Sequence, residues 1–275
     1  MARKLFCEIS PLTYVISVGK ERTKRHFVNS FSRVRFAKQQ KSLLPIVIHK
    51  HNSLIRRKLR NVDMGLQENK AVNLSISVPL VNGTIIRPGE TFSFWALVKN
   101  CSKRKGYKAG LTILGERPSQ AIGGGLCQFT NLLHWLALHS PLDIVEHHHH
   151  DGVDMFPDYG RQVPFGCGTS IMYNYLDYRL YNNTDTTFQF VVHTTDTHLC
   201  GELRASAPLT HGYHIIEDNK YFYSKGKTFY RCNKIYRRVI DKQTGKEVNL
   251  ELVKENEAKV LYDEAFIDKN LIRSK

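Results

Sequence analysis

Cys127 follows three consecutive glycines and one leucine, and it opens an apolar segment with helical spacing, "AIGGGLCQFTNLLHWLALHS" (residues 121–140). Unpaired backbone N–H groups at the start of a helix favour a thiolate and lower the pKa of a cysteine there. Gly124 and Gly125 allow a tight turn, and their N–H groups are candidate donors to the oxyanion of an attacked carbonyl. The pattern therefore favours a nucleophilic thiol. The alternative is a buried structural cysteine that follows a packing turn.

A thiol nucleophile normally works with a base, and four adjacent histidines follow about twenty residues downstream in "EHHHHD" (residues 146–151). In an extended strand, His148 and His150 face one side while His147 and His149 face the other. One pair is a candidate base for the thiol. The same pair is also a candidate metal site together with Cys127. A third interpretation is an exposed polar strand end. Three carboxylates are candidates to orient an imidazole, and each is alternatively an ordinary turn residue: Asp151, Asp154 and Asp158.

These residues need a scaffold, and the sequence predicts an α+β protein with mostly antiparallel sheets. Leucines and Trp135 predict a helix that starts at the Gly-Gly-Gly-Leu-Cys turn and ends near Ser140. His134 and His139 on this helix are expected to pack or face solvent. The basic N-terminal region predicts helices, one of which breaks near Gly65.

Strands are predicted elsewhere from alternation and turn signals. Residues 72–98 alternate apolar and polar side chains around an Asn82-Gly83 hairpin signal and a Pro88-Gly89 turn. Residues 169–204 predict consecutive strands joined by an Asn-Asn-Thr-Asp turn. Residues 209–262 predict further hairpins, most clearly around Thr244-Gly245. The predicted organisation is a basic, helix-rich region (1–70), a core domain (71–205) and a hairpin-rich extension of that domain (206–275).

The net charge of +15 is concentrated at the N-terminus. Residues 1–60 contain fifteen Lys or Arg against Glu8 and Glu21, which is +13. An anionic membrane surface is one expected partner of this segment, and a solvated basic face is the alternative. Because no nucleic-acid-binding motif accompanies the charge, nucleic acid is not an expected partner.

The chain of 275 residues, 41% hydrophobic and 24% charged, has the composition of an ordinary globular protein. It contains no run of 18 apolar residues and no recognisable signal peptide, so we expect a cytoplasmic protein, peripheral to the inner membrane face if the basic segment binds there. Six cysteines without a CxxC pair favour reduced thiols. No cofactor is expected.

Three segments together resemble the VanW family: "LVNGTIIRPGETFSFWALV", "YKAGLTILGERPSQAIGGGLCQFTNLLHWLALHSPLDIVEHHHH" and "YLDYRLYNNTDTTFQFVV". The resemblance implies a bacterial protein connected with cell-wall peptidoglycan or glycopeptide resistance, with a peptidoglycan precursor or stem peptide as partner. Some exported members are thought to be L,D-transpeptidases with a cysteine nucleophile, which falls on Cys127 here. Gln128 matches the family glutamine beside it, and the family H-x-H falls on His148 and His150.

The resemblance therefore predicts Cys127, His148 and His150 as catalytic residues, with Gly124, Gly125 and Gln128 binding the oxyanion or substrate. In one respect this chain departs from the family pattern: Cys167 occupies a slot that is acidic in many members, so an orienting acid is missing there or is supplied by Asp151 or Asp154. Cys167 is alternatively a partner of Cys127 or a metal ligand. A non-catalytic accessory protein that binds wall precursors or a partner enzyme is the competing function.

Overall fold

The computed structural model describes residues 5–57, 63–114, 117–149, 152–155, 157–158 and 162–273. The helices are α1 (Pro11–Phe31), α2 (Met64–Val81), α3 (Phe94–Val98) and α4 (Cys127–Leu138), with short 3-10 turns η1 (Phe6–Glu8), η2 (Lys103–Lys105), η3 (Glu264–Phe266) and η4 (Lys269–Leu271). No helix in these ranges is both long and apolar enough to cross a membrane.

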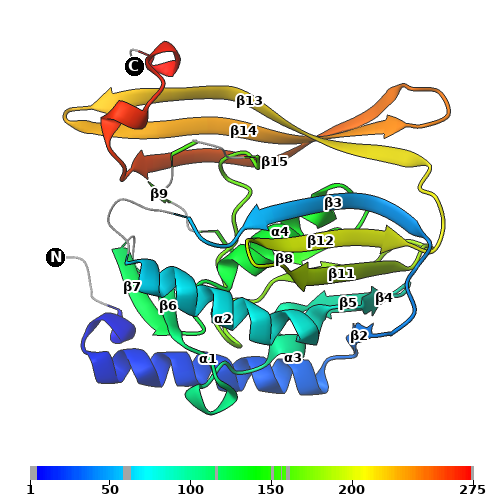
Figure 1. Cartoon of the computed structure of the whole chain (residues 1–275), viewed down its shortest axis with the longest axis horizontal. Helices are drawn as coiled ribbons and strands as arrows, with labels where there is room; N and C mark the ends of the chain where they lie inside the picture. Colours follow the sequence, from blue (N-terminus) through cyan, green and yellow to red (C-terminus); the bar gives the residue numbers. More distant parts are fainter. Residues whose placement is uncertain are drawn as a thin grey trace.

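Two sheets and a hairpin form the body below the C-terminal layer (Figure 1). One sheet has the order β1 (Arg35–Phe36), β5 (Glu90–Ser93), β10 (Arg179–Tyr181), β8 (Asp143–Glu146). The other has the order β2 (Lys38–Gln39), β4 (Thr84–Ile86), β11 (Phe188–Thr194), β12 (His198–Ala205), β3 (Ile46–Leu54). The hairpin joins β6 (Ala109–Leu114) and β7 (Arg117–Ile122).

A third sheet lies over this body and is built from long C-terminal strands (Figure 1). Its order is β13 (His211–Lys225), β14 (Thr228–Asp241), β15 (Glu247–Val260), β9 (Gly152–Asp154). Only the β1–β5 and β9–β15 pairs are parallel among the described strands. The predicted α+β class with mostly antiparallel sheets is confirmed, as are the strands of 188–205 and the turn at Thr244-Gly245.

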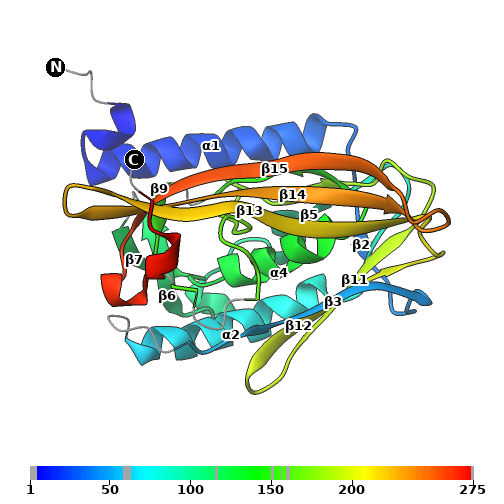
Figure 2. The ribbon, with the colours of Figure 1, turned by 90° about the horizontal axis from the view of Figure 1, so that it is seen from above.

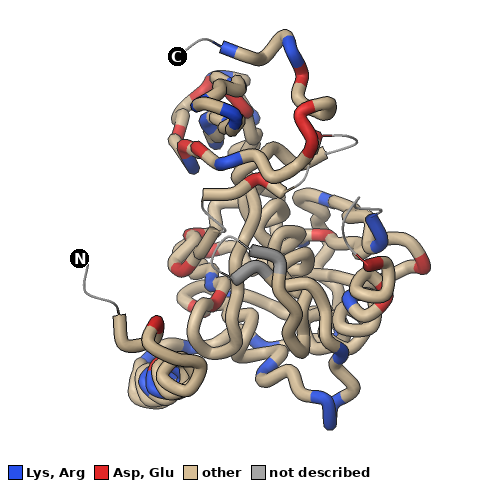
Figure 3. The backbone as a smooth tube through the Cα atoms, turned by 90° about the vertical axis from the view of Figure 1, so that its left-hand side faces the viewer, with Lys and Arg blue, Asp and Glu red and all other residues tan. Residues whose placement is uncertain are grey.

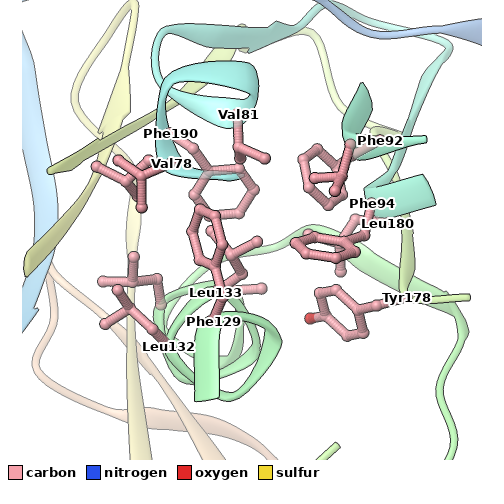
Figure 4. Packing of buried hydrophobic residues seen from close by; sticks show 14 of the residues in the cluster. Val78, Val81, Phe92, Phe94, Phe129, Leu132, Leu133, Tyr178, Leu180 and Phe190 are labelled. Atoms are coloured by element: carbon pink, nitrogen blue, oxygen red, sulfur yellow. The ribbon is translucent and has the colours of Figure 1, made fainter. Parts of the chain in front are cut away.

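The main core lies between α4, α2 and the body sheets. Figure 4 shows Phe129 and Leu133 of α4 facing Val78 of α2 and Phe190 of β11. All four side chains are buried. Seen from above, α4 lies between α1 and α2, which occupy opposite edges of the molecule (Figure 2). The helix that carries the cysteine is therefore fixed on its apolar face by the core.

The predicted strand over residues 72–81 is wrong, because this segment belongs to α2. The alternation misled because two of its polar residues, Asn73 and Ser77, are buried too. Asn73 donates to the carbonyl oxygens of Lys108 and Gly124, and Ser77 bonds the Tyr107 hydroxyl at 3.0 Å. Asn82-Gly83 ends the helix instead of forming a hairpin, with Gly83 in the left-handed region at φ +76°.

The Pro88-Gly89 turn is present, but it joins strands of different sheets. β4 pairs with β11 and β5 pairs with β10. The N-terminal region also contributes more than helices. β3 forms the edge of the five-stranded sheet beside β12, with Leu54 opposite His198. This strand brings the N-terminal third of the chain to the cysteine helix, which it contacts through Gln128.

Candidate active site

Cys127 is the first residue of α4, as the sequence predicts. The glycine turn before it is required by close approaches as well as by backbone angles. A Cβ on Gly124 would lie 2.1 Å from the Gly110 carbonyl oxygen of β6. Gly125 has a φ of +89°, and a Cβ there would lie 2.4 Å from Cγ of Lys70. Because these glycines have no side chain, the turn packs closely between the β6–β7 hairpin and α2, and this fixes where helix α4 begins.

A cavity of about 470 Å³ opens at Cys127, within the size range of small-ligand sites. Its walls come from α2, the start of α4, residues 165–169 and the β15–β9 edge of the C-terminal sheet. The side chains that line the cavity include Lys70, Gln128, Asn131, His149, Asp154 and Thr169. The C-terminal sheet thus forms a wall of the cavity that contains the cysteine.

The thiol of Cys127 does not have the lowered pKa that its helix position predicts. Burial raises its pKa, while the backbone N–H groups of Ile171 and of Cys127 itself act in the opposite direction. Loss of water around the sulfur outweighs the favourable potential of the helix start. The protein therefore holds a neutral thiol at pH 7, and a base must take its proton during any nucleophilic attack.

The histidine that lines the cavity is His149, whereas His148 of the predicted pair does not line it. His148 turns away to Glu146, with Nε2 3.1 Å from Oε1. Because Glu146 is held by Arg25 and Arg179, it provides a fixed anionic partner for His148. His150 and Asp151 lie outside the described residues.

His149 belongs to a column of three imidazoles. The ring of His147 lies 3.9 Å from that of His149 and 4.1 Å from that of His134. Burial, with His149 as a further cause, lowers the pKa of His147 to about 3, and burial lowers the pKa of His134 well below its ordinary value. His147 and His134 are therefore neutral at pH 7 and form an uncharged support behind His149.

Two of the three predicted oxyanion or substrate residues are engaged elsewhere. The Gly124 N–H donates to the Ala121 carbonyl at 2.9 Å, so it is not available to a substrate oxygen. Gln128 donates through Nε2 to Ser53 Oγ and to the Leu54 carbonyl oxygen, which ties α4 to β3. Gly125 lines the cavity, and its N–H has no acceptor within the described part of the chain.

Sequence reasoning missed Lys70, Asn131 and Thr169. Burial, with Arg57 and Arg56 as further causes, lowers the pKa of Lys70 to about 8, and its Nζ donates to Gln67 at 2.8 Å. Asn131 Oδ1 accepts from the Thr169 N–H and hydroxyl. Asn131 is one helical turn after Cys127, so its spacing was a usable signal. No sequence pattern marks Lys70 or Thr169.

The acidic candidates serve the scaffold. Asp154 pairs with Arg231 at 3.1 Å and accepts from the Tyr262 hydroxyl, and Asp158 pairs with Arg231 and Lys220. Cys167 is buried beside Leu138 and Ile235. No group of three metal-binding side chains occurs among the described residues.

A family profile described as "VanW like protein" matches residues 69–204. The chain is 32% identical over 219 residues to "Vancomycin B-type resistance protein VanW" of Enterococcus faecalis, covering 80% of this chain and 79% of that protein. It is 28% identical over 118 residues to "Uncharacterized protein YoaR" of Bacillus subtilis, covering 42% and 36%. No solved structure matches.

Proposed function

Because the chain belongs to the VanW-like protein family, we propose that it acts in glycopeptide resistance as a cysteine acyltransferase on a peptide of a peptidoglycan precursor. The observation that carries the proposal is the shared cavity of Cys127 and His149. A thiol at a helix start that shares a cavity of ligand size with an imidazole supplies the nucleophile and the base that thiol acyl transfer uses.

In the first step, Sγ of Cys127 attacks a peptide carbonyl carbon while His149 takes the thiol proton. The S–C bond forms, and the carbonyl oxygen becomes an oxyanion. His149 then gives the proton to the leaving nitrogen as the C–N bond breaks, which leaves a thioester on Cys127. In the second step an amine or water, deprotonated by His149, attacks the thioester. The protonated thiol returns when the S–C bond breaks.

The cavity supplies donors for the oxygen that becomes charged. The backbone N–H of Cys127 forms a hydrogen bond to the sulfur of the same residue, so it lies near the carbon that this sulfur attacks. Gly125 lines the same cavity, and its backbone N–H is a second donor. Lys70 places a cationic amine on the α2 wall at pH values below about 8. We assign Lys70 to the carboxylate or oxyanion of the peptide, because it lines the same cavity as Cys127 and its Nζ is oriented by the hydrogen bond to Gln67.

A binding protein without turnover is the second candidate, and the raised pKa of Cys127 favours it. A binder needs the cavity and Lys70, but it has no need for a reactive thiol. In this alternative the precursor peptide occupies the same cavity, and no bond to sulfur forms.

Intact-protein mass spectrometry after incubation with a peptidoglycan stem peptide separates the two functions. The enzyme adds the acyl fragment at Cys127, and Cys127→Ala abolishes the addition while Cys7→Ala, in turn η1 and outside the cavity lining, keeps it. His149→Gln is expected to remove the adduct, whereas His148→Gln retains it. Saturable peptide binding without an adduct, and unaffected by Cys127→Ala, supports the binding protein and overturns catalysis.

A further inference from the structure

Helix α1 is attached to the body by its polar face. Arg25 forms a two-pronged ion pair with Glu146 at 2.6 and 2.7 Å. Arg22 donates to the Tyr173 carbonyl at 3.2 Å, and Asn29 accepts from Arg179 at 2.9 Å. The spacing of 22, 25 and 29 places these three contacts on one side of the helix. An ordinary surface helix instead turns its apolar side toward the core.

The opposite side of α1 carries large apolar side chains in solvent. Leu12 is 69% exposed, Ile16 51%, Phe27 59% and Phe31 82%. Phe27 and Phe31 stack on each other at 6.1 Å between ring centroids, so they form one continuous surface. The helix has no buried residue. Leu5, Phe6 and Ile9 in and beside η1 extend the apolar surface beyond the helix start.

Cations lie within this face and just beyond its end, because Lys20 and Lys24 fall on the same side of the helix as Phe27 and Phe31. Lys20 and Lys24 are exposed on α1, and Arg33, Arg35 and Lys38 are exposed just after it. The segment of residues 1–60 carries a net charge of +13. Figure 1 and Figure 3 both show α1 at the side of the molecule away from the long C-terminal sheet, so the sheet does not cover it.

We propose that the exposed face of α1 docks on an anionic lipid bilayer, lying in the headgroup region. Exposed aromatic and aliphatic side chains together with neighbouring lysines and arginines supply the two attractions that hold a helix at an anionic surface, burial of apolar groups and charge. Charge selects this partner over a second copy of the chain, because the exposed cations on and just after α1 repel those of another copy while anionic headgroups attract them. The inference is independent of any chemistry at Cys127.

Attachment through the polar face also orients the protein. Glu146, which holds Arg25 of α1, directly precedes the histidine column of the cavity. Docking by α1 therefore leaves the C-terminal sheet, and the cavity of which it forms a wall, on the side of the molecule away from the bilayer (Figure 1).

Sedimentation of the full chain with vesicles tests this proposal. We expect binding to phosphatidylcholine vesicles containing phosphatidylglycerol, little binding to phosphatidylcholine alone, and release by added salt. Leu12→Ser/Ile16→Ser/Phe27→Ser/Phe31→Ser is expected to lower the partition constant at least about tenfold. Lys20→Gln/Lys24→Gln is expected to lower it roughly fivefold for each charge removed. The matched control is Leu250→Ser/Leu252→Ser on β15, whose side chains are 49% and 53% exposed.

Three results overturn the proposal. The first is absence of binding to anionic vesicles by the intact chain. The second is binding that the control lowers as much as the α1 variant does. The third is a dimer in sedimentation velocity without lipid that the α1 substitutions dissociate, because it assigns the face to a second copy. Circular dichroism of each variant confirms that the fold is kept.

Discussion

Asn131 accepts two hydrogen bonds from Thr169 through one oxygen, from the backbone N–H at 2.6 Å and from the hydroxyl at 2.9 Å. Thr169 is 1% exposed, and its hydroxyl also lies 3.4 Å from the Cys127 carbonyl oxygen. This pair fastens the 168–171 segment to the helix of the cysteine. The wall of the cavity nearest to the sulfur is therefore set by an amide one turn away from it.

Asn131→Ala is expected to lower the free energy of unfolding by about 1–3 kcal/mol, because the buried N–H of Thr169 loses its acceptor. Iodoacetamide labelling of Cys127 is expected to become faster as the wall loosens. Urea denaturation and peptide mass spectrometry measure the two effects. Asn131→Asp keeps the acceptor oxygen and serves as the control; equal stability loss in both variants would contradict the assignment.

Cys127 is expected to react more slowly with iodoacetamide in the folded protein at pH 8 than in the urea-unfolded chain. Burial raises its pKa, so less thiolate is present at that pH in the folded state. Labelling rates across pH 7 to about 10.5, with urea at matched pH, check this. Faster labelling in the folded protein at pH 8 would show that the unliganded site already holds a thiolate.

Gly125→Ala is expected to destabilise the protein more than Gly226→Ala. Both glycines are in the left-handed region, at φ +89° and +62°, so each substitution pays a similar backbone cost of about 1–2 kcal/mol. Only the Cβ at position 125 meets Lys70, at 2.4 Å from Cγ, whereas nothing lies within 4 Å at position 226. Chemical denaturation of the two variants measures the difference, and equal losses would show that Lys70 moves aside without cost.

The free energy of unfolding is expected to fall as the pH drops from about 6.5 to about 4. His49 stacks on His139 with ring centroids 3.6 Å apart, and burial, together with His139 and His51, lowers the pKa of His49 to about 4 from 6.5. Unfolded His49 takes up a proton at a pH where the folded group does not, so protons favour the unfolded state in this window.

His49→Gln is expected to make that pH dependence shallower, as measured by urea denaturation at pH 7.5 and 4.5. His193→Gln on β11, where the side chain is exposed, is the matched control. The histidine stack is not the cause if the slopes of the native protein and of His49→Gln coincide. His51 and His139, whose pKa values burial also lowers, contribute in the same direction.

Arg231→Ala is expected to cost about 3–5 kcal/mol, because it leaves Asp154 buried without its cation. Arg231 is 1% exposed and Asp154 2%, and Asp154 also lines the cavity. Asp154→Asn added to Arg231→Ala is expected to restore part of the loss. Arg238→Ala, which breaks an exposed pair with Glu247, is expected to cost less than about 1 kcal/mol in the same denaturation assay. Similar losses at both arginines would show that burial of the charge is not decisive.

Local sequence determined the position of the cysteine, because a glycine turn, an apolar helix and its first residue all lie within twenty residues of chain. The same holds for β11, β12 and the β14–β15 turn, whose alternation and turn residues are local signals. The polar residues of α2 led to the wrong strand prediction, because Asn73 and Ser77 are buried and form hydrogen bonds with residues about thirty or more positions away in the chain. Alternation of apolar and polar residues indicates a strand with one solvent-exposed face only where the polar side chains reach solvent.

Tertiary structure alone decided what surrounds the sulfur. From the sequence, either alternate pair of the histidine run can face the cysteine. In the structure, Arg25 and Arg179 hold Glu146 where it binds His148, and His149 lines the cavity. Lys70 reaches the cavity from a helix more than fifty residues earlier in the chain. The raised pKa of Cys127 likewise depends on desolvation by segments distant in sequence. Helix potential is a local property, but the loss of water around a side chain depends on everything packed against it.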